Sequence, residues 1–158
     1  MPRKVTKSLK RTLPADRVYD SVLVTKMINK VMLSGKKRQA EHLVYSAIEQ
    51  AATKTKKEPM DVFESAIKNV SPQVQVRSKR IGGANYQVPM EVKGDRKVHY
   101  AMIWMLESAR NKKGKSFDKK LADELVAAYK NEGDAIKKKI DTHQMAEANK
   151  AFAHFARY

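Results

Sequence analysis

The chain has 158 residues, of which 42% are hydrophobic, so it is long enough and apolar enough to fold as one domain with a modest core. Its 33 Lys and Arg residues outnumber its 17 Asp and Glu residues and give a net charge of +16, which indicates a polyanionic partner: nucleic acid or, as a rival, an anionic membrane surface. The absence of cysteine excludes disulfides and thiolate metal sites and fits a reducing cytoplasm. No apolar run approaches the roughly 20 residues that span a bilayer, so we expect no transmembrane helix. The charged first residues lack the apolar stretch of a secretory signal, so we expect no such signal.

The first 13 residues form a basic segment with no acidic residue. Its cations are Arg3, Lys4, Lys7, Lys10 and Arg11. Because such a segment has little to bury, we predict an extended arm over 1–13 that becomes ordered on a partner. A solvated end without a partner would have the same composition, so the residues alone leave both interpretations open.

Apolar residues at helical spacing predict about six helices in the single domain expected over 14–158. The first helix is expected at about 20–33, the second follows it and ends at about 52, and the third runs from Pro59 to before Pro72. The fourth is expected at about 96–110, and the fifth and sixth begin after the N-cap residues Ser116 and Asp134. The helix at 96–110 is apolar on nearly all sides, which is typical of a helix in the centre of a core.

One stretch, VQVRSKRIGGANYQVPMEV, alternates apolar and polar residues instead of repeating them at helical spacing. Alternation with a period of two residues predicts β-strands, one before and one after Gly82 and Gly83. These glycines permit the positive φ of a tight turn. Pro89 has no N–H to donate and therefore suits an edge strand. We predict a β-hairpin at about 73–92 whose base leans on the helices and whose basic end projects, mobile until a partner holds it. The expected fold is thus mostly α, with one protruding basic hairpin and an extended arm.

No pattern in the sequence predicts catalysis. The four histidines are scattered without an i,i+4 pair, so a zinc site is not expected, and the chain has no nucleophile elbow, Walker loop or dinucleotide fingerprint. An RNA-modifying enzyme would need a cofactor loop or a buried acid–base pair, and the sequence suggests neither. We therefore expect no enzyme activity, no catalytic residue, no metal and no cofactor.

Basic residues recur where the predicted helices and the hairpin end. The clusters lie in the arm and at 36–38, 77–80, 96–97, 110–115 and 137–139. A single cluster is commonly a solvated face, but helix ends that converge in space would together form a phosphate-binding surface. Asn85, Tyr86 and the aromatic C-terminus add groups that hydrogen-bond to or stack on unpaired RNA bases. The alternative is a DNA-architectural protein with its ribbon in the minor groove, for which only Ile81 is available as an apolar wedge near the turn.

Three stretches carry a resemblance to a known family: LSGKKRQAEHLVYSAIE, FESAIKNVSPQVQVRSKRIGGANYQVPMEV and GDAIKKKIDTHQMAEANKAFAHF. They are similar to protein seven of the small ribosomal subunit in its bacterial form, and the similarity covers nearly the whole chain in order. The resemblance implies a mostly helical protein with a β-ribbon that binds the 3′ major domain of 16S rRNA, nucleates assembly of the subunit head and resides in the cytoplasmic ribosome. It also implies neighbouring head and platform proteins as partners, and no homo-oligomer.

The resemblance assigns roles to three groups of residues. The rRNA-binding group is Arg3, Lys4, Lys7, Lys10, Arg11, Lys36, Lys37, Arg38, Arg77, Lys79, Arg80, Arg96, Lys97, Arg110, Lys112, Lys113 and Lys115. The ribbon tip, expected near the exit-site tRNA, is Ile81, Gly82, Gly83, Ala84, Asn85 and Tyr86. The group expected toward the mRNA exit path and a platform protein is Met145, Asn149, Lys150, Phe152, His154, Arg157 and Tyr158. Where family members often have a cation this chain has Ile103, so we expect that position to pack against protein or a base.

Overall fold

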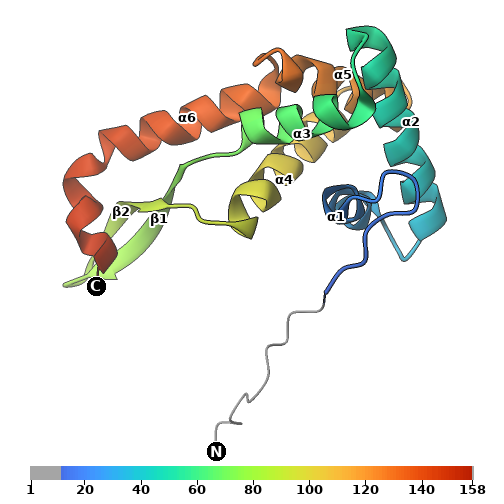
Figure 1. Ribbon diagram of the computed structural model, residues 1–158. Helices are drawn as coiled ribbons and strands as arrows, with labels where there is room; N and C mark the ends of the chain where they lie inside the picture. Colours follow the sequence, from blue (N-terminus) through green and yellow to red (C-terminus); the bar gives the residue numbers. More distant parts are fainter. Residues whose placement is uncertain (1–11, 158) are drawn as a thin grey trace, which may run out of the picture.

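The computed structural model describes residues 12–157 and contains, within them, six α-helices, a two-stranded hairpin and a C-terminal 3₁₀ helix (Figure 1). In chain order these are α1 (Val22–Val31), α2 (Lys37–Thr55), α3 (Pro59–Val70), β1 (Val74–Ile81), β2 (Ala84–Glu91), α4 (Asp95–Asn111), α5 (Phe117–Tyr129), α6 (Asp134–Ala148) and the 3₁₀ helix η1 (Lys150–Arg157). The predicted fold class, mostly helical with one hairpin, is confirmed. The arm cations Arg3, Lys4, Lys7, Lys10 and Arg11 lie outside the described residues, as do Tyr158 and the side chain of Arg157.

Helix α4 occupies the centre of the helical body. Its Met102 and Met105 are fully buried, and the helix contacts α1, α3, α5 and α6. Burial of one such side chain stabilises the fold by ~1.5–3 kcal/mol, so the apolar circumference of α4 accounts for its central position. Ile103 is half-buried and packs against the same core, in agreement with the expectation that this position contacts protein.

Helix α1 is shorter than the predicted 20–33, because a turn stabilised by Asp16 precedes it. The Asp16 carboxylate accepts three backbone hydrogen bonds of 2.9–3.0 Å from the N–H groups of Val18, Tyr19 and Ser21. An aspartate that binds the backbone just beyond it stabilises a turn at the expense of helix. Helix α2, in contrast, continues to Thr55, past the predicted end at about 52.

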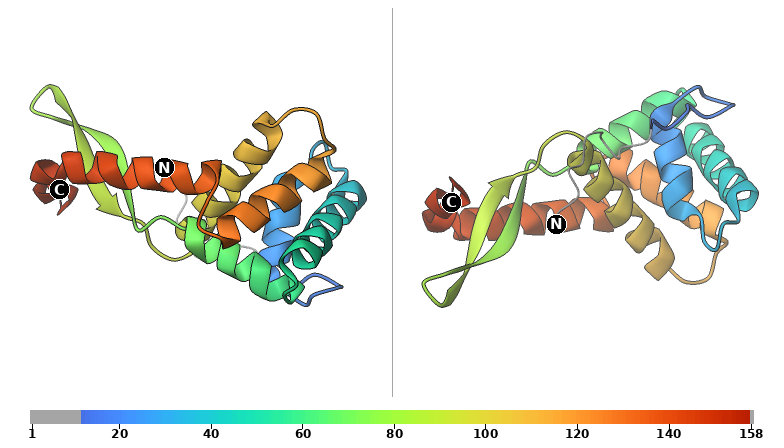
Figure 2. Two further views of the ribbon diagram at one scale, coloured as in Figure 1. Left: turned by 90° about the horizontal axis from the view of Figure 1, so that it is seen from above. Right: turned by 90° about the horizontal axis from the view of Figure 1, so that it is seen from below.

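Helix α6 extends from the helical body to the ribbon, as Figure 2 shows from two sides. Its N-terminus is capped by Glu124 of α5, in place of the predicted Asp134. Glu124 is fully buried, and its Oε1 accepts the N–H of Ala135 at 3.1 Å, while Lys112 lies 2.5 Å from its other carboxylate oxygen. A buried charge is tolerated only when it is paired and hydrogen-bonded, so this one carboxylate ties the end of α4 and the start of α6 to α5.

The ribbon, formed by β1 and β2, pairs in antiparallel register from Val74↔Glu91 to Ile81↔Ala84. Gly82 and Gly83 form the turn at φ +56° and +90°, as predicted. The base of the ribbon is buried through Val88 and Val92. The segment η1 contacts β2 at Tyr86, while the turn of the ribbon projects beyond it (Figure 2).

Candidate nucleic-acid interface

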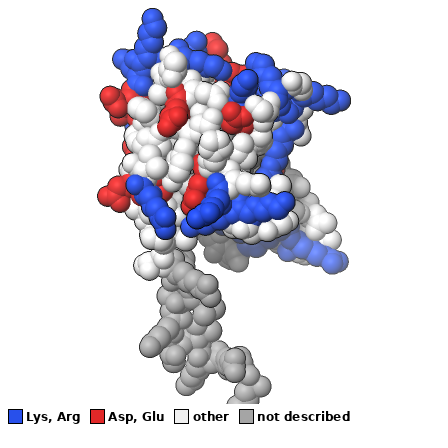
Figure 3. Space-filling view, turned by 90° about the vertical axis from the view of Figure 1, so that its right-hand side faces the viewer, with Lys and Arg blue, Asp and Glu red and all other residues white. Residues whose placement is uncertain are grey.

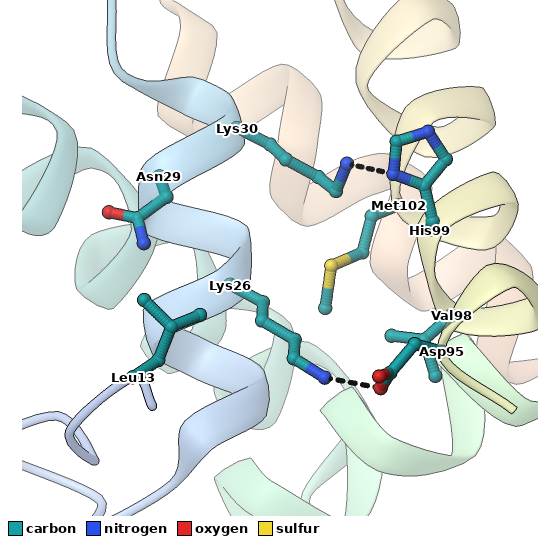
Figure 4. A pocket seen from close by; sticks show the side chains of 8 residues that line it. All are labelled: Leu13, Lys26, Asn29, Lys30, Asp95, Val98, His99 and Met102. Carbon is teal, nitrogen blue, oxygen red and sulfur yellow. Dashed lines mark hydrogen bonds and ion pairs between the residues drawn. The ribbon is translucent and has the colours of Figure 1, made fainter. Parts of the chain in front are cut away.

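Side chains from α1 and α4 form a basic groove at the protein surface (Figure 4). Lys26 Nζ lies 2.8 Å from Asp95 Oδ1, and Lys30 Nζ lies 2.8 Å from His99 Nδ1. The groove contains a cavity of about 320 Å³ whose remaining lining residues are Leu13, Asn29, Val98 and Met102. Two helices that are far apart in the sequence therefore meet in one polar site.

The contact between Lys30 and His99 determines which ring nitrogen of His99 carries the proton. An ammonium group can only donate hydrogen bonds, so Lys30 donates and His99 accepts through Nδ1, which leaves the imidazole proton on Nε2. Burial lowers the pKa of His99, and the charges of Lys30 and Arg96 lower it further, so His99 is neutral at pH 7. Burial also lowers the pKa of Lys30, and among the described residues no carboxylate pairs with its ammonium group.

Arg96, His99 and Arg110 fall on one face of α4 at helical spacing, and we call them, together with Lys30, the basic stripe. Toward the ribbon, Arg96 donates to Gln75 Oε1 at 3.4 Å. At the other end, Arg110 donates to the carbonyl of Lys30 at 3.5 Å, in the last turn of α1. Arg96 and Arg110 are separated by ~21 Å at 1.5 Å per residue, so the stripe is long enough to contact several phosphates.

The exposed cations Lys36, Lys37 and Arg38 follow α1 closely and begin α2. Since Arg110 binds the last turn of α1, this cluster continues the basic stripe at its far end. Figure 3 views the helical body from the side away from the ribbon and shows basic side chains gathered at its margins, with acidic side chains among them. The predicted clusters at 36–38 and 110–115 thus lie near one end of α4, and the cluster at 96–97 lies at its other end.

The cations that follow α4 are not equally available. Lys112 binds the buried Glu124, and Lys115 Nζ lies 2.9 Å from Asp123. A lysine already paired with a carboxylate adds little net charge to a phosphate site, whereas Lys113 is exposed. Arg110 and Lys113 are therefore the stronger candidates in this cluster.

The ribbon brings together two groups that the sequence keeps apart, the tip and the C-terminal residues. Tyr86 lies with its ring centroid 5.3 Å from those of Phe152 and Phe155. Lys79, which pairs with Tyr86 across the strands, donates to the carbonyl of Phe155 at 3.1 Å. Arg77 and Arg80 remain exposed.

The other residues of the predicted C-terminal group lie along α6 and η1. Met145 is exposed on α6, and Asn149 donates to its carbonyl at 2.8 Å. Lys150 pairs with Glu147 at 2.9 Å. The exposed ring of His154 lies 4.0 Å from that of Phe155, which leaves the imidazole on the outside of the aromatic cluster.

Sequence reasoning missed Lys26, Lys30 and His99 as members of the basic surface. Lys26 and Lys30 are four residues apart on the polar side of α1, so they share a face of that helix. That spacing was a usable signal, but the facing position of His99 depends on how α1 packs on α4. Within residues 12–157 there is no cluster of three or more metal-ligating side chains, and no helix is long and apolar enough to cross a membrane.

Comparison with known proteins identifies one family. Residues 2–150 match the family model described as ribosomal protein S7p/S5e. Among curated proteins, the small ribosomal subunit protein uS7 of Thermotoga petrophila is 54% identical over 92% of this chain and 94% of its own length. The protein of that name from Chloroflexus aurantiacus is 55% identical over 94% of this chain and 94% of its own length. The one from Chloroflexus aggregans is 52% identical over 99% of this chain and 99% of its own length.

Proposed function

Because this chain belongs to the ribosomal protein S7p/S5e family, we propose that it binds the rRNA of the small subunit through the basic stripe and its flanking clusters. The chain is a structural, RNA-binding protein of the small ribosomal subunit in the cytoplasm, and it is not an enzyme. The observation that supports the rRNA proposal best is the arrangement of cations along α4, to which α1, the start of α2 and the ribbon base contribute.

The proposed target is the 3′ major domain of 16S rRNA, which the protein would bind first and so nucleate assembly of the subunit head. A protein that binds folded RNA without help needs a surface that is already in place. The stripe satisfies this condition, because α4 is buried along its other faces and its cations are held by Gln75, His99 and the end of α1.

A competition titration tests this proposal. Labelled 3′-domain rRNA is challenged with duplex DNA and with unrelated folded RNA at several salt concentrations. We expect the rRNA to be preferred by several orders of magnitude at physiological salt, as for specific complexes in general. Equal competition by all three with one salt slope would mean that the chain recognises charge alone, and a preference for duplex DNA would favour the DNA-architectural alternative.

We also propose that the ribbon tip lies near the exit-site tRNA and that η1 lies toward the mRNA exit path. The exposed turn and the outward ring of His154 support this, because both offer groups to an unpaired strand. Removal of 82–85 is the clean test, since Tyr86 is needed for the contact with η1. We expect unchanged rRNA affinity and altered tRNA release from assembled subunits; a large loss of rRNA affinity would assign the tip to rRNA.

Proteins of the subunit head and platform are the proposed protein partners, with no homo-oligomer. Ile140 and Met145 are each about half exposed on α6, which suits an apolar contact with another protein. Light scattering of the isolated chain tests whether it forms a homo-oligomer. A mass near 18.0 kDa is expected for the monomer, and a stable dimer would contradict the proposal.

A further inference from the structure

The cavity between α1 and α4 has the lining of a small-ligand site. Its floor is apolar: Met102 is fully buried, Val98 is half-buried, and Leu13 closes one end. Its rim is polar and consists of Lys26, Asn29, Lys30, Asp95 and His99 (Figure 4). The volume of about 320 Å³ is at the lower end of the range for small-molecule pockets, so it suits one nucleotide and excludes a duplex.

The rim differs from a simple phosphate patch, because it offers acceptors as well as donors. The Asp95 carboxylate only accepts, Lys30 and the Nε2–H of His99 only donate, and the amide of Asn29 does both. A phosphate group displays acceptors alone and offers no donor to Asp95, which is already paired with Lys26. The edge of a base displays both donors and acceptors and therefore matches this rim better.

We propose that this pocket binds one unpaired nucleotide of the RNA, with its base against Val98, above the buried Met102, and its phosphate toward Lys30 and Arg110. The inference rests on the proposed function, since it concerns the RNA-binding surface. It also predicts a base preference. Adenine, cytosine and guanine have an exocyclic amino group that can donate to Asp95, whereas the donor on the pairing edge of uracil, its N3–H, lies between two carbonyl oxygens that a carboxylate repels.

Short single strands test the pocket directly. The full chain is titrated with tetranucleotides of adenosine, of cytidine and of uridine, and with an abasic tetranucleotide that has the same phosphates and no bases, while the methyl signals of Met102 and Val98 are followed by NMR. We expect the adenosine and cytidine strands to shift these signals, the uridine strand to do so at several-fold higher concentration, and the abasic strand not at all. Equal shifts with the abasic strand, or none with any strand, would overturn the proposal.

A variant that adds bulk at the rim of the pocket links it to the rRNA. Asn29 is exposed at the rim, so Asn29→Trp places an indole there without a change of charge. Gln144→Trp, at an exposed amide of α6, is the matched control. For Asn29→Trp we expect rRNA affinity to fall on the order of tenfold with an unchanged salt slope, because the variant excludes the base and keeps every phosphate-binding cation. For Gln144→Trp we expect neither change.

The two proposals fail in different ways. If the wild-type chain prefers 3′-domain rRNA and Asn29→Trp binds it equally well, the pocket proposal is wrong and the rRNA proposal stands. If the wild-type chain shows no preference for rRNA while single strands still shift the Met102 signal, the rRNA proposal is wrong and the pocket stands. Thermal unfolding of both tryptophan variants shows whether each is folded, so a fall in affinity is assigned to the pocket only for a folded variant.

Discussion

At the scale of single residues, the junction between α5 and α6 depends on the space next to Glu124. A Cβ at Gly133 would lie 3.0 Å from the Cβ of Ala127 and 3.3 Å from Oε1 of Glu124, and Gly133 has φ +93°. Gly114 has nearly the same φ, +89°, with no atom within 4 Å of such a Cβ. The two glycines therefore differ in the space that a Cβ would find.

We predict that Gly133→Ala lowers the free energy of unfolding more than Gly114→Ala does. In both variants an alanine at positive φ strains the backbone by ~1–3 kcal/mol, and Gly133 with ψ 174° lies in a region that is nearly restricted to glycine. Gly133→Ala also displaces the carboxylate that caps α6, which adds ~1–2 kcal/mol, the usual effect of removing a cap. Urea unfolding of the two variants measures the difference, and equal values would show that Glu124 adjusts without cost.

A second residue-scale prediction concerns Asp118, at the start of α5. A hydrogen bond from Ser116, with further bonds from Gln50 at 2.8 Å and Ser46 at 3.2 Å, lowers the pKa of Asp118 from 3.8 to about 2. Because the folded state holds this proton less tightly than the unfolded chain, the carboxylate stabilises the fold above about pH 4, and this contribution is lost as the pH falls toward 2. With solvent screening taken into account, it amounts to ~1–2 kcal/mol.

Asp118→Asn should therefore lower the free energy of unfolding at pH 7 and have a smaller effect at pH 3. Urea unfolding at the two pH values measures this. Asp141→Asn, at an exposed acid on α6, is the control and should change little at either pH. A decrease of equal size at both pH values would mean that Asp118 acts through its shape and not through its charge.

At the scale of elements, η1 and the ribbon form one packing unit. The rings of Tyr86, Phe152 and Phe155 pack together at one end of the molecule, beyond the helical body. A ring pair of this kind contributes ~0.5–1.5 kcal/mol beyond its buried area. We expect Phe155→Ala to weaken the support of β2 and to leave the helical body intact.

Hydrogen exchange resolves the two regions. For Phe155→Ala, amide protection should fall roughly tenfold in the distal half of the ribbon and stay unchanged in α4, since local opening depends on local contacts. His154→Ala removes an exposed ring of the same segment and should leave β2 protected. Unchanged protection in the Phe155 variant would show that the strand pairing alone holds the ribbon.

The elements also show what the sequence can predict. The central position of α4 and the two strands were predictable, because each depends on a periodicity within one segment. Three features were not: the Asp16 turn that shortens α1, the capping of α6 by Glu124, and the contact of η1 with β2. Each depends on which distant residue lies alongside, and a periodic pattern within one segment carries no such information. The candidate site follows the same division, since Arg96 and Arg110 were predicted, whereas Lys30 and the groove opposite His99 were not.

At the scale of the whole molecule, charge that is free must be distinguished from charge that is paired. We predict that replacement of Arg77 and Arg80 by Ala reduces the slope of log affinity against log salt by ~0.7–0.9 for each phosphate that the variant no longer neutralises. Lys115→Ala should change the slope little, because this lysine is paired with the carboxylate of Asp123. Salt titrations of rRNA binding measure all the slopes, and an unchanged slope for the arginine variant would show that the ribbon does not bind phosphate.

The contact between Lys79 and Phe155 joins residues 76 positions apart, and this separation has a consequence in time. During synthesis at ~5–20 residues per second, Phe155 follows Lys79 by roughly 4–15 s. For most of that interval the two strands and the helices before them have been synthesised, while the segment that contacts β2 does not yet exist. Until η1 is made, the ring of Tyr86 lacks the two rings against which it packs, so this part of the ribbon is completed late in synthesis.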